Sequence, residues 1–214
     1  ELKKILCPCI NNDDYKIIKV EKSKKPSKDF AIIFSRNTMF HFYVFSLDSM
    51  AFYPFNTSYN LQRSPSCVIQ NGLLAICLCD FFKVFDYRTS QLVLVVPAEY
   101  TVGVLTLDDY FLFIGKNSIH IFYTITSAFE SVLLGLDPIQ DISSCNDIVC
   151  GKFLITNHYW AGEVGWEIDL KSTPMKMNLV VNLASMLHYN YSVNKACTKV
   201  VKHTMSEVYV HSLW

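Results

Sequence analysis

The sequence predicts an all-β fold that consists of about five copies of one antiparallel sheet unit. The composition favours strands, because β-branched and aromatic side chains fit pleated surfaces and the chain contains fifteen Phe and twelve Tyr among its 214 residues. Apolar runs of strand length alternate with turn residues, which is typical of hairpins. The pattern recurs about every 40 residues, and a fixed period of that length indicates a repeat architecture.

The clearest copy contains three predicted strands that are joined by two tight turns. Leu73–Cys79 is followed by a turn at Asp80, then by Phe82–Tyr87, a turn over residues 88–90 and Gln91–Val96. Each run has the length of a strand, and residues that favour turns stand at both junctions. These features together predict an antiparallel meander.

The same order of strands and turns recurs in four other parts of the chain. The predicted strands are Phe30–Ser35, Phe40–Ser46 and Ala51–Phe55; Tyr110–Gly115, Ser118–Tyr123 and Phe129–Leu134; Lys152–Thr156, Val164–Asp169 and Pro174–Asn178; and, in an incomplete copy, Thr198–His203 and Glu207–Leu213. Equivalent third-strand positions are spaced by 40, 37, 46 and 43 residues, at Ser46, Asp86, Tyr123, Asp169 and Ser212. Each copy is preceded by a candidate innermost strand, at Tyr15–Val20, Ser66–Gln70, Thr101–Leu107, Ile139–Ser144 and Leu187–Val193.

The segment Lys83–Val93 resembles the third strand, turn and fourth strand of a WD40 repeat, with Phe85-Asp86 where that family usually has Trp-Asp. The period agrees, since WD40 repeats run at about 40–45 residues per four-stranded blade. The resemblance implies a degenerate WD40-like β-propeller of about five blades in a single domain, residues 1–214. The blades are expected over residues 15–55, 66–97, 101–134, 139–178 and 187–214.

The way in which this family closes its ring implies that residues 2–9, Leu2–Cys9, supply the outer strand of the last blade, because closure removes a free sheet edge. All copies lack the family's Gly-His pair and the full Trp-Asp dipeptide. The buried Asp-His-Ser/Thr-Trp network of better-conserved blades is therefore not expected to form in its usual way. Five blades are also fewer than the family usually has, so the chain is either a small propeller or part of a larger one.

A β-sandwich or a barrel is the competing architecture, because regularly spaced short strands suit these folds as well. The period of about 40 residues favours the propeller. Helix is scarce in either case, and only Leu179–Leu187 has weak helical spacing.

The charge balance argues against a general nucleic-acid or membrane-surface binder, which needs an excess of positive charge. Lys plus Arg and Asp plus Glu number 19 each. No apolar run reaches the roughly 18 residues that indicate a membrane span. The lysines around Pro26, which include Lys24 and Lys25, are typical of a solvated loop, with contact to an acidic partner, phospholipid or nucleic acid as the alternative.

Eight cysteines permit disulfides by their even number. However, Cys77 and Cys79 lie in an apolar strand-like run, where free thiols behave as small hydrophobes. This favours a reduced, intracellular protein in the cytoplasm or the nucleus. The C-x-C pairs also lack the C-x₂₋₄-C spacing of zinc sites, so we expect no bound metal.

No catalytic motif is apparent in the sequence. The Gly-x-Ser-x-Gly elbow is absent, and seven glycines form no phosphate-binding loop. The carboxylate pair Asp108-Asp109 stands at a predicted turn, where solvation explains it. His158 lies in the longest turn and is the best functional histidine. We expect no enzyme activity, no cofactor and no small-molecule substrate.

The resemblance implies a non-enzymatic scaffold that binds other proteins within a larger assembly. The alternatives are the substrate-receptor domain of a ubiquitin ligase, as in F-box/WD proteins, and a propeller hydrolase. Functional side chains collect in turns, so the predicted partner contacts lie in long or aromatic turns: Arg36, Arg88, Lys24, Lys25, His158, Tyr159 and Trp160. The aromatic set of residues 40–55 serves either as an exposed binding face or as packing between blades.

Overall fold

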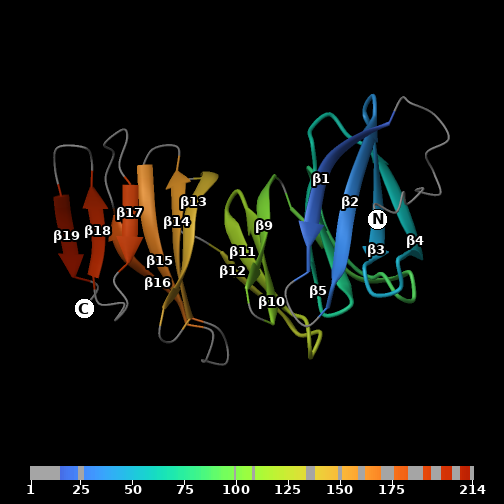
Figure 1. The fold of residues 1–214 in the computed structure, drawn as a ribbon. Helices are drawn as coiled ribbons and strands as arrows, with labels where there is room; N and C mark the ends of the chain where they lie inside the picture. The colour runs from blue at the N-terminus through green and yellow to red at the C-terminus, as the bar shows by residue number, and fades with distance from the viewer. Residues whose placement is uncertain are drawn as a thin grey trace. The chain divides into compact units, whose positions relative to one another are not determined.

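A computed structural model describes residues 15–23, 27–98, 100–107, 109–133, 138–148, 151–158, 162–169, 176–182, 190–193, 199–203 and 208–212. In these ranges the chain folds into strands β1–β19 and the turns between them (Figure 1). The strands form five sheets, and within each sheet they are paired in the order of the sequence. Each sheet is therefore a meander.

Three of these sheets follow one another from the N-terminal side. The first contains β1 (Lys16–Lys22), β2 (Asp29–Arg36), β3 (Met39–Ser46) and β4 (Ala51–Asn60). The second contains β5 (Ser66–Gln70), β6 (Leu73–Cys77), β7 (Phe81–Asp86) and β8 (Gln91–Pro97). The third contains β9 (Thr101–Leu107), β10 (Tyr110–Gly115), β11 (Ser118–Tyr123) and β12 (Phe129–Leu133).

Two further sheets follow in the C-terminal part. The fourth contains β13 (Ile139–Ile148), β14 (Gly151–His158), β15 (Gly162–Asp169) and β16 (Lys176–Asn182). The fifth contains β17 (Asn190–Val193), β18 (Lys199–His203) and β19 (Val208–Ser212). The four-stranded units predicted from the sequence are thus confirmed for the first four sheets. Leu2–Cys9, the strand predicted to complete the last unit, lies outside the described residues.

The weak helical spacing at Leu179–Leu187 does not give a helix over residues 179–182, which belong to β16. Leu179 pairs with Trp166 of β15, and Val181 pairs with Gly165. The run Leu179-Val180-Val181 is rich in β-branched residues, which favour a pleated surface, and the partner strand fixes this choice. Residues 183–187 lie outside the described part of the chain.

The chain divides into two compact units. The first consists of residues 1–115 and 119–131, and the second of residues 116–118 and 132–214. The first three sheets thus lie almost entirely in the first unit. The prediction of one domain over residues 1–214 stays a prediction.

Left-handed backbone conformations close several of the turns between strands. Asn37, Asn71 and Ser90 have φ values of 55°, 51° and 61°, and Gly72 has a φ of 83°. Asn and Gly are the residues that adopt such values most readily. Asn37 and the Asn71-Gly72 pair therefore explain why these turns reverse the chain within two residues.

The second sheet packs against a neighbour on each of its faces, and β6 supplies apolar side chains to both sides. Successive strand residues point to opposite faces. Leu74 and Ile76 accordingly join a core with the first sheet, whereas Leu73, Ala75 and Cys77 join a core with the third. All five side chains are buried. A strand that is buried on both faces has to be a continuous apolar run, as this one is.

Aromatic side chains fill both of these cores. Between the first and second sheets, the ring centroids of Phe55 and Phe85 lie 5.4 Å apart. Between the second and third sheets, Phe82 and Phe113 lie 5.0 Å apart. Such aromatic pairs contribute about 0.5–1.5 kcal/mol beyond the area that they bury. The three sheets are therefore held together mainly by side chains on the faces of their middle strands.

We predict that Leu74→Ala lowers the free energy of unfolding by about 2–5 kcal/mol, because it leaves a cavity in the core between the first two sheets. Leu92→Ala on β8 is the control, since Leu92 is 51% exposed and its loss leaves no cavity. Urea unfolding followed by circular dichroism measures both values. Equal losses for the two variants would contradict the packing described here.

Candidate interaction surfaces

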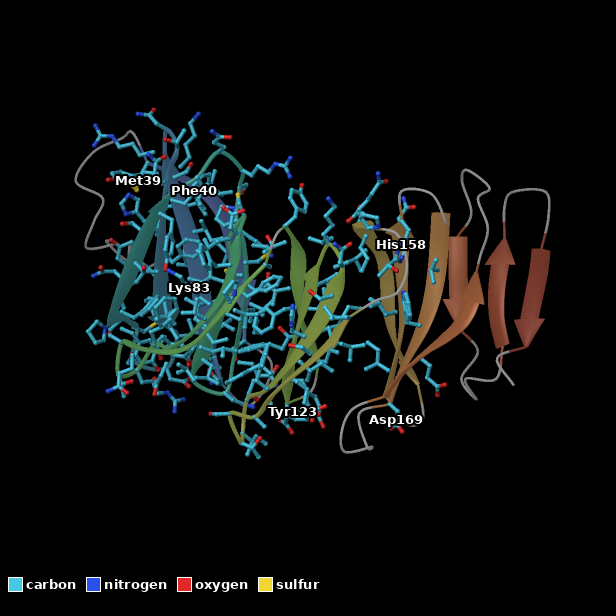
Figure 2. All side chains as sticks on the ribbon, turned by 180° about the vertical axis from the view of Figure 1, so that it is seen from behind. Met39, Phe40, Lys83, Tyr123, His158 and Asp169 are labelled. Atoms are coloured by element: carbon cyan, nitrogen blue, oxygen red, sulfur yellow. The ribbon has the colours of Figure 1, made fainter. Side chains whose placement is uncertain are left out.

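The turns of a meander lie alternately at the two ends of its sheet. In the first unit, the turn between the third and fourth strands spans residues 47–50, 87–90 and 124–128 in the three sheets. We call the end formed by these turns the turn face. Figure 2 shows Tyr123, the last residue of β11, at this end and Met39, the first residue of β3, at the opposite end.

A buried carboxylate fastens the first sheet to the second at the turn face. Asp29 begins β2, and its Oδ2 accepts hydrogen bonds from Tyr87 Oη at 2.6 Å and from Ser27 Oγ at 2.5 Å. Tyr53 Oη donates to Oδ1 at 3.4 Å. Because Tyr87 follows β7 of the second sheet, its bond to Asp29 joins two sheets.

The hydroxyl groups around Asp29 stabilise its ionised form. Burial by itself raises the pKa of Asp29, but hydrogen bonds from Ser27, Tyr87, Ser46 and Tyr53 outweigh burial and hold the pKa below the ordinary value of 3.8. Burial raises the pKa of Tyr87 in turn, and the bond to the Asp29 carboxylate raises it further. The carboxylate therefore stays charged and the phenol stays protonated at neutral pH.

A second group of hydrogen bonds fastens the second sheet to the third at the same end. Asn71 Nδ2 donates to Thr124 Oγ1 at 2.8 Å and to Asp109 Oδ1 at 3.2 Å. Thr124 Oγ1 also donates to the main-chain oxygen of Asp109 at 2.8 Å. The turn face therefore stands on polar contacts that run from the first sheet to the third.

Arg88, one of the residues predicted to contact partners, lies on the turn face. Its guanidinium lies against Gly72, where an added Cβ would approach Arg88 Cζ to 3.3 Å. Its Cζ is also 6.0 Å from the ring centroid of Tyr87. The absence of a side chain at Gly72 thus leaves room for the exposed Arg88.

Large apolar side chains are exposed in the turns of this face. Leu47 and Met50 are 45% and 41% exposed, and Ile125 is 71% exposed. Met50 also has a φ of 52°, in a region that bulky side chains rarely adopt. At the equivalent positions, the other two turns have Ser90 and Ser127, with φ values of 61° and 57°.

These exposed residues were not predicted from the sequence. A signal for them was present, because Leu47, Met50 and Ile125 are large apolar residues in segments that read as turns. Turns usually carry polar residues and glycine. An apolar residue that stays in such a place without entering a core is a candidate for a contact with another molecule.

Arg36, also predicted to contact partners, lies at the opposite end, as the last residue of β2 before the turn to β3. Its guanidinium is 5.7 Å from the ring centroid of Tyr15, which in turn makes an edge contact with His41 at 5.4 Å. The structure therefore does not bring Arg36 and Arg88 together. Lys24, Lys25, Tyr159 and Trp160 lie outside the described residues.

His158, the histidine singled out from the sequence, is buried in the fourth sheet with 2% of its surface exposed. Its Nε2 is 2.8 Å from Thr156 Oγ1, which also accepts a hydrogen bond from Trp166 Nε1 at 2.8 Å. From the sequence, the Asp-His-Ser/Thr-Trp network was not expected to form in its usual way. A histidine, a threonine and a tryptophan are nevertheless connected here, with the histidine at the end of β14. This position favours a structural role, and a contact of His158 with a partner stays a prediction.

His120 is a second buried histidine with structural contacts. Its Nδ1 is 2.7 Å from Ser131 Oγ, and its ring stacks on Phe129 with centroids 5.7 Å apart. Burial lowers the pKa of His120 below the ordinary value of 6.5. The ring is therefore neutral at neutral pH.

The aromatic set of residues 40–55 is used largely for packing. Phe40, Phe42 and Phe55 belong to the core between the first and second sheets. On the other face of the first sheet, Phe45 and Phe52 make an edge contact at 5.2 Å, and Phe45 is buried. These residues therefore serve for packing and not as an exposed binding face.

Among the residues that the structure describes, no cluster of three or more His, Cys, Asp or Glu side chains is placed to hold a metal ion. No helix there is long and apolar enough to cross a membrane.

Comparisons with known proteins identify the fold. No protein-family model and no curated protein sequence matches the chain. BamB from Moraxella catarrhalis has a similar structure, with a TM-score of 0.58 and 15% identity over 91% of this chain and 57% of BamB. The β-propeller domain of Cps50 (Swd1) from Myceliophteria thermophila matches with a TM-score of 0.50 and 11% identity, over 92% of this chain and 70% of that domain.

At these identities the similarity establishes the fold alone. It confirms the WD40-like β-propeller architecture that the repeat pattern implied. The chain spans less than two thirds of the length of BamB.

We predict that Tyr87→Phe lowers the free energy of unfolding by about 1–3 kcal/mol at neutral pH, because Asp29 loses a buried donor. A carboxyl group with a lowered pKa stabilises the fold above its ordinary pKa, and this contribution is lost as the pH falls through its folded value. The difference between variant and wild type should therefore shrink below pH 3.8, the ordinary pKa. Urea unfolding at neutral pH and below pH 3.8 measures this difference in the free energy of unfolding.

Tyr123→Phe is the matched control, since Tyr123 ends the equivalent strand but donates to Glu130 of its own sheet at 3.2 Å. We expect a smaller loss in this variant. A Tyr87→Phe variant that is as stable as Tyr123→Phe at neutral pH would contradict a bond that joins two sheets.

We also predict that His120 makes the protein less stable in mild acid. A histidine with a lowered pKa binds its proton more readily in the unfolded chain, so stability decreases as the pH falls below the ordinary value of 6.5. The His120→Gln variant should show a weaker dependence over this range. Thermal unfolding at a series of pH values tests this, and an unchanged dependence would count against a neutral, buried His120.

Proposed function

We propose that this chain, a WD40-like β-propeller by its fold, is a non-enzymatic scaffold that holds partner proteins through the turn face of its first unit. The observation that carries the proposal is the exposure of Leu47, Met50 and Ile125 in turns of the face that also carries Arg88. Exposed apolar patches mark sites of protein interaction, and Met and Arg are enriched in protein interfaces.

The hydrogen bonds beneath the turn face support this role. Asp29 with Tyr87, and Asn71 with Thr124, join neighbouring sheets directly below the exposed turns. A surface that is rigid before binding loses less conformational entropy when a partner docks. Met50 adds to the argument, because a strained backbone position that carries an exposed apolar side chain is often kept for function.

Three buried ionisable side chains also favour a scaffold over an enzyme. His158 and His120 are buried and bonded to hydroxyl groups, and Asp29 is surrounded by hydroxyl donors. The polar atoms of these side chains are therefore engaged in hydrogen bonds that stabilise the fold. A substrate receptor of a ubiquitin ligase would use the same kind of surface, and the identity of the bound proteins distinguishes it from a general scaffold.

We further propose that the protein works in a reducing compartment inside the cell. Cys67, Cys77 and Cys79 are free thiols. Burial raises the pKa of Cys67 to about 12, so this thiol stays protonated and unreactive. Burial also raises the pKa of Cys77.

The test is to isolate the protein with its natural partners and to weigh the complexes by native mass spectrometry. We expect the triple variant Leu47→Asp, Met50→Asp and Ile125→Asp to lose a partner that wild type retains. Loss of anchor residues of this kind weakens binding by about 30-fold or more, because each contributes about 2 kcal/mol or more.

The control variant is Met39→Asp, which places a charge at an exposed apolar position at the opposite end of the first sheet. It should retain the partner. If the triple variant folds, as judged by circular dichroism, and still retains every partner of the wild type, the turn face is not the binding surface.

A further inference from the structure

The end of the first unit that lies opposite the turn face carries several exposed cations. Lys16 begins β1 and Arg36 ends β2, the strand with which β1 pairs, so these two cations lie at the same end. Arg63 follows β4. The N–H of Leu61 donates to the main-chain oxygen of Thr38 at 2.8 Å, so the segment that carries Arg63 lies against the turn after β2. All three cations are exposed.

Tyrosine rings hold the two arginines in place. Arg36 Cζ is 5.7 Å from the ring centroid of Tyr15, and Arg63 Cζ is 4.9 Å from that of Tyr100. A ring attracts a guanidinium electrostatically, but it does not neutralise the charge. Among the described residues, no carboxylate lies within ion-pair distance of Arg63. The structure therefore positions the charge of Arg63 without cancelling it.

A lysine of the second sheet extends this positive surface. Lys83 lies in β7, and its Nζ is 4.8 Å from the ring centroid of Tyr59 and donates to Tyr59 Oη at 3.5 Å. Tyr59 pairs with Phe40, which lies next to Met39 at this end in Figure 2. No carboxylate of the described residues lies within ion-pair distance of Lys83. We call the four cations together the basic end: Lys16, Arg36, Arg63 and Lys83.

The carboxylates in the described part of the first unit are distributed in the opposite way. At the basic end this part of the chain has only Asp80, in the turn before β7. The others lie in the turn face or in the strand ends next to it: Glu21, Asp29, Asp48, Asp86, Asp109 and Glu130. The two ends therefore differ in charge, although Lys plus Arg and Asp plus Glu number 19 each in the whole chain. Such a field attracts a molecule of opposite charge to one end.

The chemistry of the basic end fits an acidic protein segment better than a nucleic acid. A single-stranded nucleic acid binds through bases that stack on aromatic rings, and a cation occupies one face of each of Tyr15, Tyr59 and Tyr100. Asp80 also repels a backbone that carries a phosphate at every nucleotide. A peptide can have carboxylates only where the cations lie, and a planar guanidinium pairs with a carboxylate through two parallel hydrogen bonds.

We propose that the basic end binds an extended segment, rich in Asp and Glu, of a partner protein. Carboxylates of this segment pair with Arg63 and Lys83, and the charges of Lys16 and Arg36 attract it. Because Lys83 reaches Tyr59, and Asn60, Leu61 and Gln62 separate Tyr59 from Arg63, the two cations lie within the reach of about five extended residues. This inference does not rest on the proposed function, because the turn face lies at the other end of the sheets.

The test is the fluorescence anisotropy of a labelled decaglutamate peptide that is titrated with the full-length protein. Wild type should bind it, and more weakly as salt is added, because salt screens exposed charges. Arg63→Gln with Lys83→Gln should weaken binding by about tenfold, through the loss of two ion pairs. The matched control is Arg88→Gln with Lys28→Gln, which removes the same two residue types from the turn face and should bind as wild type does.

Two single variants test the arrangement of the basic end. Tyr100→Leu keeps the charge of Arg63 but removes its ring, so binding has to order the arginine and should weaken by about two- to fivefold. Met39→Asp places a carboxylate between Arg36 and Asn60, with which Met39 pairs. It should weaken peptide binding although it retains the partner of the turn face.

A labelled single-stranded oligonucleotide is the competing probe. A wild type that binds the oligonucleotide but not the peptide overturns the proposal. So does a double variant of Arg63 and Lys83 that folds, as judged by circular dichroism, and binds the peptide as wild type does, or an equal loss in the turn-face control. The turn-face triple variant should still bind the peptide, so a failure of the proposed function is distinguishable from a failure of this inference.

Discussion

The middle strand β6 is buried on both faces, and the packing of the first three sheets depends on this. Its alternating side chains enter two different cores, one shared with the first sheet and one with the third. A single polar residue on such a strand would leave an unpaired group in one of the cores, and that is costly. The hydrophobic effect therefore places the second sheet between the first and the third. It also requires that neither face of β6, in the middle of the second sheet, is exposed to solvent.

Hydrogen bonds add direction to this packing. Apolar contacts between sheets are tolerant of small displacements, whereas the bond between Tyr87 and Asp29 has one geometry. The same holds for Asn71 with Thr124. These bonds lie at one end of the sheets, so the turns at that end are held in fixed positions. The apolar cores thus hold the sheets together, and a few polar contacts fix their positions. The exposed apolar residues of the turn face lie at the same end of the sheets as these polar contacts.

The sequence predicted the strands well because their signals are local. The run from Leu73 to Val96 has turn residues at each junction, and its three strands form where the pattern placed them. The Asp29 contacts were not predictable, because they depend on how two sheets align. His158 was read as a turn residue, but β14 extends to it and the ring bonds to Thr156 inside the sheet. The two arginines looked alike in the sequence, and only the alternation of turns separates them.

The partners in the Tyr87–Asp29 bond are 58 residues apart in the chain. During synthesis at about 5–20 residues per second, Asp29 leaves the ribosome some 3–12 s before Tyr87 does. Through that interval the first sheet has its carboxylate without the donor from its neighbour, and the face that later meets β6 is uncovered. The nascent chain is therefore exposed to wrong associations until the second sheet is complete, so this is the stage of its production at which a chaperone would have most effect.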